Sequence, residues 1–542
     1  MYRVNNAIIL AAGYGSRFIP ITFHTPKGLI PVKGVPMIER QIRQLKEAGI
    51  HEIIIVVGYK KEQFRYLKDR YEGIKFVYSR DYYAKNNLSS LYCARQHLKN
   101  SYILSSDNWI WKNMFKSHEE RSWYSCVYKE GKTSEWCVSI DDDEKITGVT
   151  IGGEDSWVMY GPVFLSRDFS IPFKEVIYRY YHKAGTEKYM WENVFIEEIK
   201  NFSLYINRQK SGNVYEFESL VELRRFDPES GYNTKSPYLD LITQVFNTTE
   251  KEISSVERLK AGMTNDSFSF SIGNSAYVFR RPGEGANVLI NRRHEKSTYE
   301  AIKSHGICDR VVYFDDESGI KISCLERNAV NTDPRNERDV ADSLDILRII
   351  HNKKININHV FSIDREIKRY LNLLPGKDNL RYIRYVQAYF KIVRIINIVK
   401  RLKIEKRICH IDCNPDNFIR LKDNSLRLID WEYAGLCDPI IDIGMYSIYS
   451  NYTKNESDRL LSLYLQRDPD SEEYMRLYAY MCLGGFLWML WTEYKRFFGV
   501  QFGDYGQKMR QYADVYYDYT AMLEETIKQR RQHENKRIRN PV

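Results

Sequence analysis

The first residues that could do chemistry lie near the N-terminus of this 542-residue chain, in the run Leu10-Ala-Ala-Gly13-Tyr-Gly15-Ser-Arg17. Glycines let backbone amides approach phosphate oxygens closely. Arg17 and Lys27 could then neutralise a triphosphate and its pyrophosphate leaving group. We therefore expect attack on an α-phosphate here, with Arg17 and Lys27 as catalytic cations. The nucleotide contacts expected in this loop are Leu10, Ala11, Ala12, Gly13, Gly15 and Ser16.

A second reactive set lies far downstream, in His410-Ile-Asp412-Cys-Asn-Pro-Asp-Asn417, followed by Ile429-Asp430-Trp-Glu432. In transfer of a γ-phosphate, one Asp orients and deprotonates the acceptor hydroxyl, while an Asn and a second Asp hold Mg²⁺ on the nucleotide. The spacing assigns Asp412 as the base and Asn417 and Asp430 as metal ligands. The chain is thus expected to carry two nucleotide sites of unrelated design.

The elements around the first site alternate regularly. Apolar strands are predicted at 7–12, 52–57, 75–79 and 101–106, with helices at 36–48, 61–71 and 88–97 between them. This alternation predicts a mixed, mostly parallel sheet of Rossmann-like α/β type, covered on both faces. Ligands of such sheets bind at the carboxyl ends of the strands, where Gly13, Gly58 and Asp107 fall.

The second half has another character. A hairpin is predicted around Gly273-Asn274, a helix at 294–305, and long helices beyond residue 335. A small mixed lobe followed by a large helical lobe is typical of a bilobal, protein-kinase-like α+β fold. Turn-forming residues cluster at 226–237. We therefore divide the chain into a domain at 1–228, a linker at 229–250, a domain at 251–527 and a basic tail at 528–542.

Composition limits the other classes of function. The net charge of +10 is modest, the nine cysteines include no Cys-x-x-Cys pair, and the longest apolar stretch, Tyr478–Trp491, is too short to span a bilayer. We expect a soluble cytoplasmic protein without nucleic-acid partners or membrane insertion, in which homo-oligomers are possible. The basic tail is interpreted as a solvated helix end.

The N-terminal half resembles the bacterial CTP:phosphocholine cytidylyltransferases of the nucleotidyltransferase superfamily, over about residues 5–225. Its loop carries the likeness, together with Val57-Gly58-Tyr59, Asn86-Asn87, Ser89-Ser90-Leu91-Tyr92 and Asp107-Asn108. The resemblance implies CTP and phosphocholine as substrates and Asp107 as a Mg²⁺ ligand. It also implies a second acidic cluster, matched here by Glu192, Glu216 and Glu218, although the family pattern favours Asp at 192 and 218.

Further contacts at this site are expected from Gly58, Asn87 and Ser89 for the nucleotide, and from Trp136 and Trp191 for the quaternary ammonium. Aromatic faces attract such cations. The alternative for the tryptophans is a place in the core. The alternative for the acids is the solvated surface, and for the Asn and Ser side chains it is helix capping.

The C-terminal half resembles the choline kinase and aminoglycoside phosphotransferase family, over about residues 240–510. The resemblance implies a phosphate-covering turn with Gly262, Thr264 and Asn265, and an ATP-bracing Arg280 held by Glu295. For choline it implies an aromatic box of Trp488, Trp491 and Tyr494, with charge from Glu432 and Asp438. A stripe of aromatic residues on a helix is also typical of a core, and this alternative stays open.

Together the two halves predict a bifunctional, Mg²⁺-dependent enzyme. ATP and choline would give phosphocholine, and CTP and phosphocholine would give CDP-choline and pyrophosphate. One alternative is a sugar-1-phosphate nucleotidyltransferase fused to another small-molecule kinase, of ethanolamine or aminoglycoside type. Another is a non-catalytic nucleotide-binding module.

Overall fold

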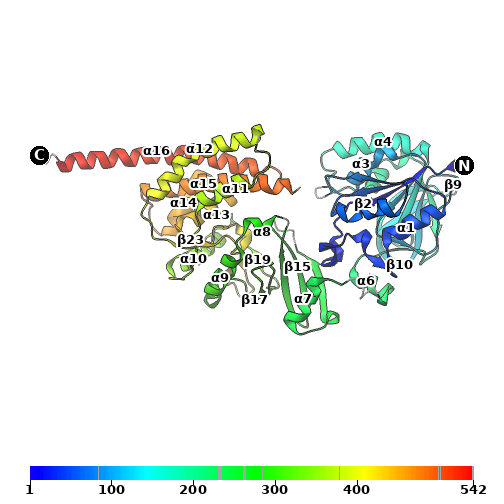
Figure 1. Ribbon diagram of the computed structural model, residues 1–542, viewed down its shortest axis with the longest axis horizontal. Helices are drawn as coiled ribbons and strands as arrows, with labels where there is room; N and C mark the ends of the chain where they lie inside the picture. Colours follow the sequence, from blue (N-terminus) through cyan, green and yellow to red (C-terminus); the bar gives the residue numbers. More distant parts are fainter. Residues whose placement is uncertain are drawn as a thin grey trace. The chain divides into compact units, whose positions relative to one another are not determined.

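The chain folds into two compact units, Met1–Lys251 and Glu252–Val542. The computed structural model (Figure 1) describes residues 1–82, 85–229, 235–259, 264–283, 285–377, 379–498, 500 and 502–539. The stretch interpreted as a linker contains helix α7 (Pro237–Phe246), and the predicted basic tail is the last part of helix α16 (Tyr505–Arg539).

The first unit is built on a seven-stranded sheet of order β12-β10-β11-β7-β2-β5-β6. Four of the six neighbouring pairs are parallel, which confirms the mixed, mostly parallel sheet. Its strands are β2 (Asn6–Ala11), β5 (Ile53–Val57), β6 (Ile74–Tyr78), β7 (Ser101–Ser105), β10 (Trp123–Ile140), β11 (Ile146–Leu165) and β12 (Tyr205–Gln209).

Both faces of this sheet are buried, because alternate residues of a strand point to opposite sides. Ile8 and Leu10 of β2 pack with residues of α3 (Asn87–Ala94) and α4 (Arg167–His182). Ala7 and Ile9 pack with residues of α1 (Met37–Glu47). The continuous apolar strands seen in the sequence follow from this double burial, and the carboxyl ends of β2 and β7 remain open to a cleft.

The antiparallel part of the sheet is the long hairpin β10–β11. Its pairing has several register shifts, as between Lys129 and Lys132 and between Thr133 and Trp136. Charged residues and glycines interrupt the alternating pattern there, so periodicity did not predict this hairpin.

The second unit begins with an antiparallel sheet of order β14-β15-β16-β18-β17. The predicted hairpin around Gly273-Asn274 is β15–β16, and helix α9 (Arg292–Ile302) follows it. The strands are β14 (Ile253–Arg258), β15 (Asn265–Ile272), β16 (Ser275–Pro282), β17 (Val311–Phe314) and β18 (Lys321–Cys324).

A helical lobe completes the second unit and confirms the kinase-like arrangement. Its long helices are α10 (Glu337–Asn352), α11 (Ile363–Leu373), α12 (Leu380–Arg401), α13 (Ile440–Tyr449), α14 (Lys454–Leu465), α15 (Ser471–Phe497) and α16. Figure 1 shows α12 and α16 beside α15, which is buried along most of its length. The apolar stretch Tyr478–Trp491 is thus the centre of the lobe. Among the described residues no helix is long and apolar enough to cross a membrane.

Candidate active sites

A cleft of about 490 Å³ opens at the carboxyl ends of β2 and β7. The predicted loop residues Leu10, Ala11, Ala12, Gly13, Gly15, Ser16 and Arg17 line it, with Lys27, Asn87, Asp107 and Glu216. The loop and the distant acids are therefore brought together, as a parallel sheet requires.

Lys27 lies at the centre of this cleft. Its Nζ is 2.7 Å from Asp107 Oδ2. Gly15 has a φ of +67°, and a Cβ on it would lie 2.9 Å from Lys27 Cβ, so a glycine is needed where the loop passes this lysine. An ammonium beside a carboxylate and a loop of backbone amides can balance the charge of a nucleotide and its metal ion.

The three candidate glutamates differ in position. Glu216 lines the cleft, where desolvation and the Asp107 carboxylate raise its pKa to about 8. Glu192 lies behind the wall, held by Asn87 Nδ2 at 3.4 Å and by the Tyr124 hydroxyl at 3.3 Å, and desolvation raises its pKa to about 7. Glu218 is exposed and pairs with Arg17 at 2.6 Å.

The donor set of the cleft fits a hard cation. The carboxylate of Asp107 lies close enough to Glu216 to disfavour the ionisation of Glu216, and oxygen ligands suit Mg²⁺. Glu192 does not line the cleft, and it accepts a hydrogen bond from Asn87, which does.

The expected aromatic contacts do not line this cleft. Trp191 is 2% exposed, stacks on Tyr124 with ring centroids 6.1 Å apart and meets Phe173 edge-on. Trp136 packs partly buried against the same core. The structure therefore favours the core interpretation for both tryptophans, because their apolar rings fill the space beneath the hairpin and α4.

Two further residues that were expected to contact the nucleotide, Ser89 and Gly58, are buried and do not line the cleft. Ser89 is buried and donates to the Asn86 carbonyl at 2.8 Å, while its neighbour Ser90 lines the cleft. Gly58 is covered by the Tyr82 ring, since a Cβ added to Gly58 would lie 2.8 Å from Tyr82 Cδ1. Sequence reasoning missed Tyr82, Lys85 and Ser106, which line the cleft; the basic residue just before Asn86-Asn87 was the one readable signal.

A cleft of about 620 Å³ lies in the second unit. Thr264, Asn265, Arg280, Asp412, Asn417 and Asp430 line it, whereas Gly262 lies outside the described residues. Asn417 Nδ2 donates to Asp412 Oδ2 at 3.2 Å, which leaves the amide oxygen of Asn417 for another ligand. Burial raises the pKa of Asp412 to about 6; the Asp430 carboxylate adds to this, and hydrogen bonds from Tyr449 and Asn417 oppose it.

The loop that carries Asp412 is held in a strained form. Ile411 has a φ of +71°, which a β-branched residue rarely adopts. Asp442 on α13 stabilises it, since its carboxylate accepts from the backbone N–H of His410 at 2.8 Å and of Ile411 at 2.7 Å. His351 holds Asp442 from the other side at 3.0 Å.

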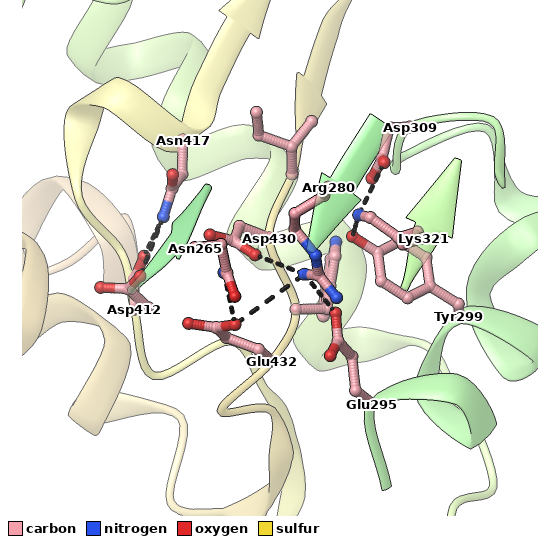
Figure 2. A network of polar contacts seen from close by, with 12 residues as sticks. Asn265, Arg280, Glu295, Tyr299, Asp309, Lys321, Asp412, Asn417, Asp430 and Glu432 are labelled. Carbon is pink, nitrogen blue, oxygen red and sulfur yellow. Dashed lines mark hydrogen bonds and ion pairs between the residues drawn. The ribbon is translucent and has the colours of Figure 1, made fainter. Parts of the chain in front are cut away.

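Arg280 is the centre of the nucleotide side of this cleft (Figure 2). Its Nη1 lies 2.6 Å from Glu295, 3.1 Å from Asp430 and 3.8 Å from Glu432. Because this guanidinium fills the space between the three carboxylates, the oxygen donors that fit Mg²⁺ are those of Asp430 and Asn417, which face the open cleft.

Glu432 therefore has another role than the one expected. Its Oε2 accepts from Asn265 Nδ2 at 2.9 Å and from Arg292 Nη1 at 3.1 Å, and it is 5% exposed. Its charge stabilises the arginines and the turn of Asn265 instead of the acceptor. Asp438 is likewise paired with Arg476.

Aromatic side chains line the part of the cleft where the sequence predicted an aromatic box. Trp488 and Trp491 line it with Tyr433, Tyr449 and Tyr505. The ring of Trp488 meets that of Tyr433 edge-on, with centroids 5.3 Å apart, and the tilted ring of Tyr449 at a centroid distance of 5.9 Å. Tyr494 does not line it, because its hydroxyl points to the Gly285 carbonyl at 3.3 Å. Tyr433, Tyr449 and Tyr505 line the cleft but were not predicted, since no motif marks them.

Comparison with known proteins separates the two units. Residues 7–107 match the model of the MobA-like NTP transferase domain, and residues 255–478 match the phosphotransferase enzyme family. A choline-phosphate cytidylyltransferase of Streptococcus pneumoniae is 38% identical over 221 residues, which are 41% of this chain and 96% of that protein. The chain belongs to both families.

Other relatives differ in what their names say they act on. A 2-aminoethylphosphonate cytidylyltransferase of Lancefieldella rimae is 37% identical over 225 residues, 41% of this chain and 92% of that protein. The crystal structure of choline kinase LicA from Streptococcus pneumoniae is 30% identical, with a TM-score of 0.46, and the match covers 52% of this chain and 100% of that one. The protein is thus a nucleotidyltransferase joined to a phosphotransferase of the choline kinase family, and both families typically use Mg²⁺ with nucleoside triphosphates.

The anchoring role of Asp442 can be tested by Asp442→Asn. The amide keeps one acceptor but turns a donor toward the backbone N–H groups, so the strained loop loses a charged partner. Such a loss costs about 1.5–3 kcal/mol, and we expect ATP-dependent phosphotransfer to fall about tenfold or more. Nucleotidyl transfer by the same preparation serves as the control. An unchanged phosphotransfer rate would contradict the role given to Asp442.

The raised pKa of Asp412 predicts a pH dependence. The sequence assigns Asp412 as the general base, a role that requires the deprotonated form, so kcat for phosphotransfer should fall below pH of about 6, by about tenfold per unit. An Asp of ordinary pKa would keep the rate constant to about pH 4–5. Steady-state rates at saturating nucleotide between pH 5 and 8 measure this. A profile that stays flat down to pH 5 is the opposing result.

Proposed function

We propose that this chain converts choline to CDP-choline in two steps. The second unit transfers the γ-phosphoryl group of ATP to choline, and the first unit transfers CMP from CTP to the phosphocholine formed. The aromatic acceptor pocket beside Asp412 is the observation that carries this proposal. The names of the relatives in both halves support it.

The chemistry of the pocket favours choline over ethanolamine. A primary ammonium needs hydrogen-bond acceptors, whereas a quaternary ammonium is held by aromatic faces, each contributing ~0.5–2 kcal/mol. Two tryptophans and three tyrosines line the pocket, and the nearby carboxylate of Glu432 is already used by Arg292 and Asn265. Asp412 is needed for the hydroxyl, so the aromatic faces are the groups proposed to hold the ammonium.

The presence of a kinase on the same chain favours a phosphate ester for the first unit. In 2-aminoethylphosphonate the phosphorus is bound to carbon, and no hydroxyl phosphorylation makes such a compound. A kinase of a small alcohol makes the ester that a phosphocholine cytidylyltransferase consumes. The same argument disfavours a sugar-1-phosphate substrate, because the acceptor pocket is apolar and aromatic where a sugar would need polar partners.

In the kinase step, Asp412 takes the proton of the choline hydroxyl as its oxygen bonds to the γ-phosphorus and ADP leaves. Arg280 braces the phosphates, with Asp430 and Asn417 as the residues that would hold Mg²⁺. A bound magnesium ion would neutralise charge developing on the transferred phosphoryl group. Trp488 and its neighbours orient the ammonium end so that the hydroxyl meets Asp412.

In the cytidylyl step, a phosphate oxygen of phosphocholine attacks the α-phosphorus of CTP, and pyrophosphate leaves. The nucleophile is already an anion, so no base is required and the protein supplies position and charge. Lys27 and Arg17 stabilise the leaving group, and Asp107 and Glu216 would hold Mg²⁺. Burial and the Asp107 carboxylate raise the pKa of Glu216, and such an ion would favour the charged form of Glu216.

The proposal predicts that the protein with choline, ATP, CTP and Mg²⁺ accumulates CDP-choline. Asp412→Asn should reduce the kinase step at least about 10³-fold while phosphocholine plus CTP still reacts, because it removes the base. Asp107→Asn should do the reverse. Separation of products by chromatography measures both steps. Formation of no CDP-choline from phosphocholine and CTP would exclude the proposal for the first unit.

Acceptor choice tests the aromatic pocket. Trp488→Ala should raise the KM for choline about tenfold or more, the loss expected for a buried cation–π face, and leave the KM for ATP within about twofold. The exposed Trp111, in the first unit, provides the control Trp111→Ala. Comparable kcat/KM for ethanolamine and choline in the unaltered protein would favour the alternative kinase.

A further inference from the structure

A second buried ion pair lies beside Arg280, on the neighbouring strand. Lys321 of β18 is the direct cross-strand partner of Arg280 of β16. Its Nζ donates to Asp309 Oδ2 at 2.9 Å and to the Tyr299 hydroxyl at 2.6 Å, and Figure 2 shows the three side chains converging next to the arginine. Lys321 is 5% exposed and Asp309 8%.

The position of Tyr299 links this pair to the nucleotide site. Tyr299 lies on α9, four residues after Glu295, so both side chains point from the same face of the helix toward the sheet. Glu295 holds Arg280 of β16, and Tyr299 holds Lys321 of β18. Helix α9 is therefore tied to two adjacent strands by polar contacts one helical turn apart.

The first of these ties shares its cation with the proposed nucleotide site. In the structure Arg280 shares its charge among Glu295, Asp430 and Glu432. A nucleotide bound in this cleft would add its phosphates to the groups that share the charge of Arg280. The contact between Lys321 and Tyr299 involves none of these groups and stays in place.

Stability alone does not account for a charged group at this position. Burial by itself would raise the pKa of Asp309, but the Lys321 ammonium lowers it, so the carboxylate stays charged in the interior. Taking two charges out of water is costly, and well-packed apolar residues of similar volume are commonly as stable. What a hydrogen-bonded charge adds is a fixed direction.

We propose that Lys321, Asp309 and Tyr299 form a lock that positions α9, and through it Glu295 and Arg280, for nucleotide binding. Tyr299 does not line the cleft and is a positioning residue, whereas Lys321 and Asp309 also line the cleft beside Arg280. The inference rests on the proposed use of ATP by this unit. It assigns a specific effect to the lock, on the affinity for ATP and not on that for choline.

The lock is tested with Tyr299→Phe, which removes one hydroxyl, and with Lys321→Met, both in the full chain. Each should raise the KM for ATP by about tenfold, the size expected for losing a hydrogen bond to a charged group, with the KM for choline within about twofold. Lys296→Met is the matched control. It removes a surface ion pair of the same helix, Lys296 with Asp316 at 2.8 Å, and should leave both KM values unchanged.

A fully apolar variant separates positioning from folding. Lys321→Met combined with Asp309→Leu and Tyr299→Phe leaves no buried charge unpaired, so its thermal midpoint should return close to that of the unaltered protein. Its KM for ATP should stay raised. An unchanged KM for ATP in this variant and in Tyr299→Phe, or an equal rise in the KM for choline, would overturn the lock. Absence of phosphotransfer in the unaltered protein would instead refute the proposed kinase activity.

Discussion

The carboxylate of Asp442 holds the second active site together. Two consecutive backbone N–H groups, those of His410 and Ile411, donate to it from a loop whose φ at Ile411 is +71°. A strained backbone persists only where its surroundings determine it. His410 extends the anchor through its Nε2, which lies 2.9 Å from the Ile429 carbonyl, next to Asp430. The loops of Asp412, the proposed base, and of Asp430, a proposed metal ligand, are thus positioned by one buried charge.

The two units handle anionic substrates in different ways. The first opens a loop of glycines and backbone amides beside a single lysine–carboxylate pair, so its charge balance is completed by what binds. The second holds Arg280 and Arg292 among Glu295, Asp430 and Glu432 before any ligand arrives. Preorganised charge of the second kind needs little rearrangement during reaction. In the first cleft, burial and the Asp107 carboxylate disfavour the charged form of Glu216, which a bound cation would favour.

Much of this could be predicted from the sequence, because strand and helix periods and local motifs are short-range signals. The parallel strands, the hairpin at Gly273-Asn274 and the grouping of Gly13, Gly15, Lys27 and Asp107 follow from them. Glu432 was misassigned because its partners, Arg292 and Asn265, lie 140 and 167 residues away. Trp191 shows the same limit, since a tryptophan at the start of α5 (Trp191–Glu197) has the same local pattern in a core as in a pocket. Tyr449 and Tyr505 line the second cleft because α13 and α16 pack beside it, and no sequence motif indicates that packing.

The place of Tyr505 on the last helix has a consequence for how the protein is made. The described residues that line the first cleft all fall between Leu10 and Glu216, whereas the acceptor pocket of the second needs Tyr505 of α16. Domains fold in the order of synthesis, N-terminal first. On the ribosome, the site that acts second in the proposed pathway can therefore form early, and the site that acts first is among the last to be closed.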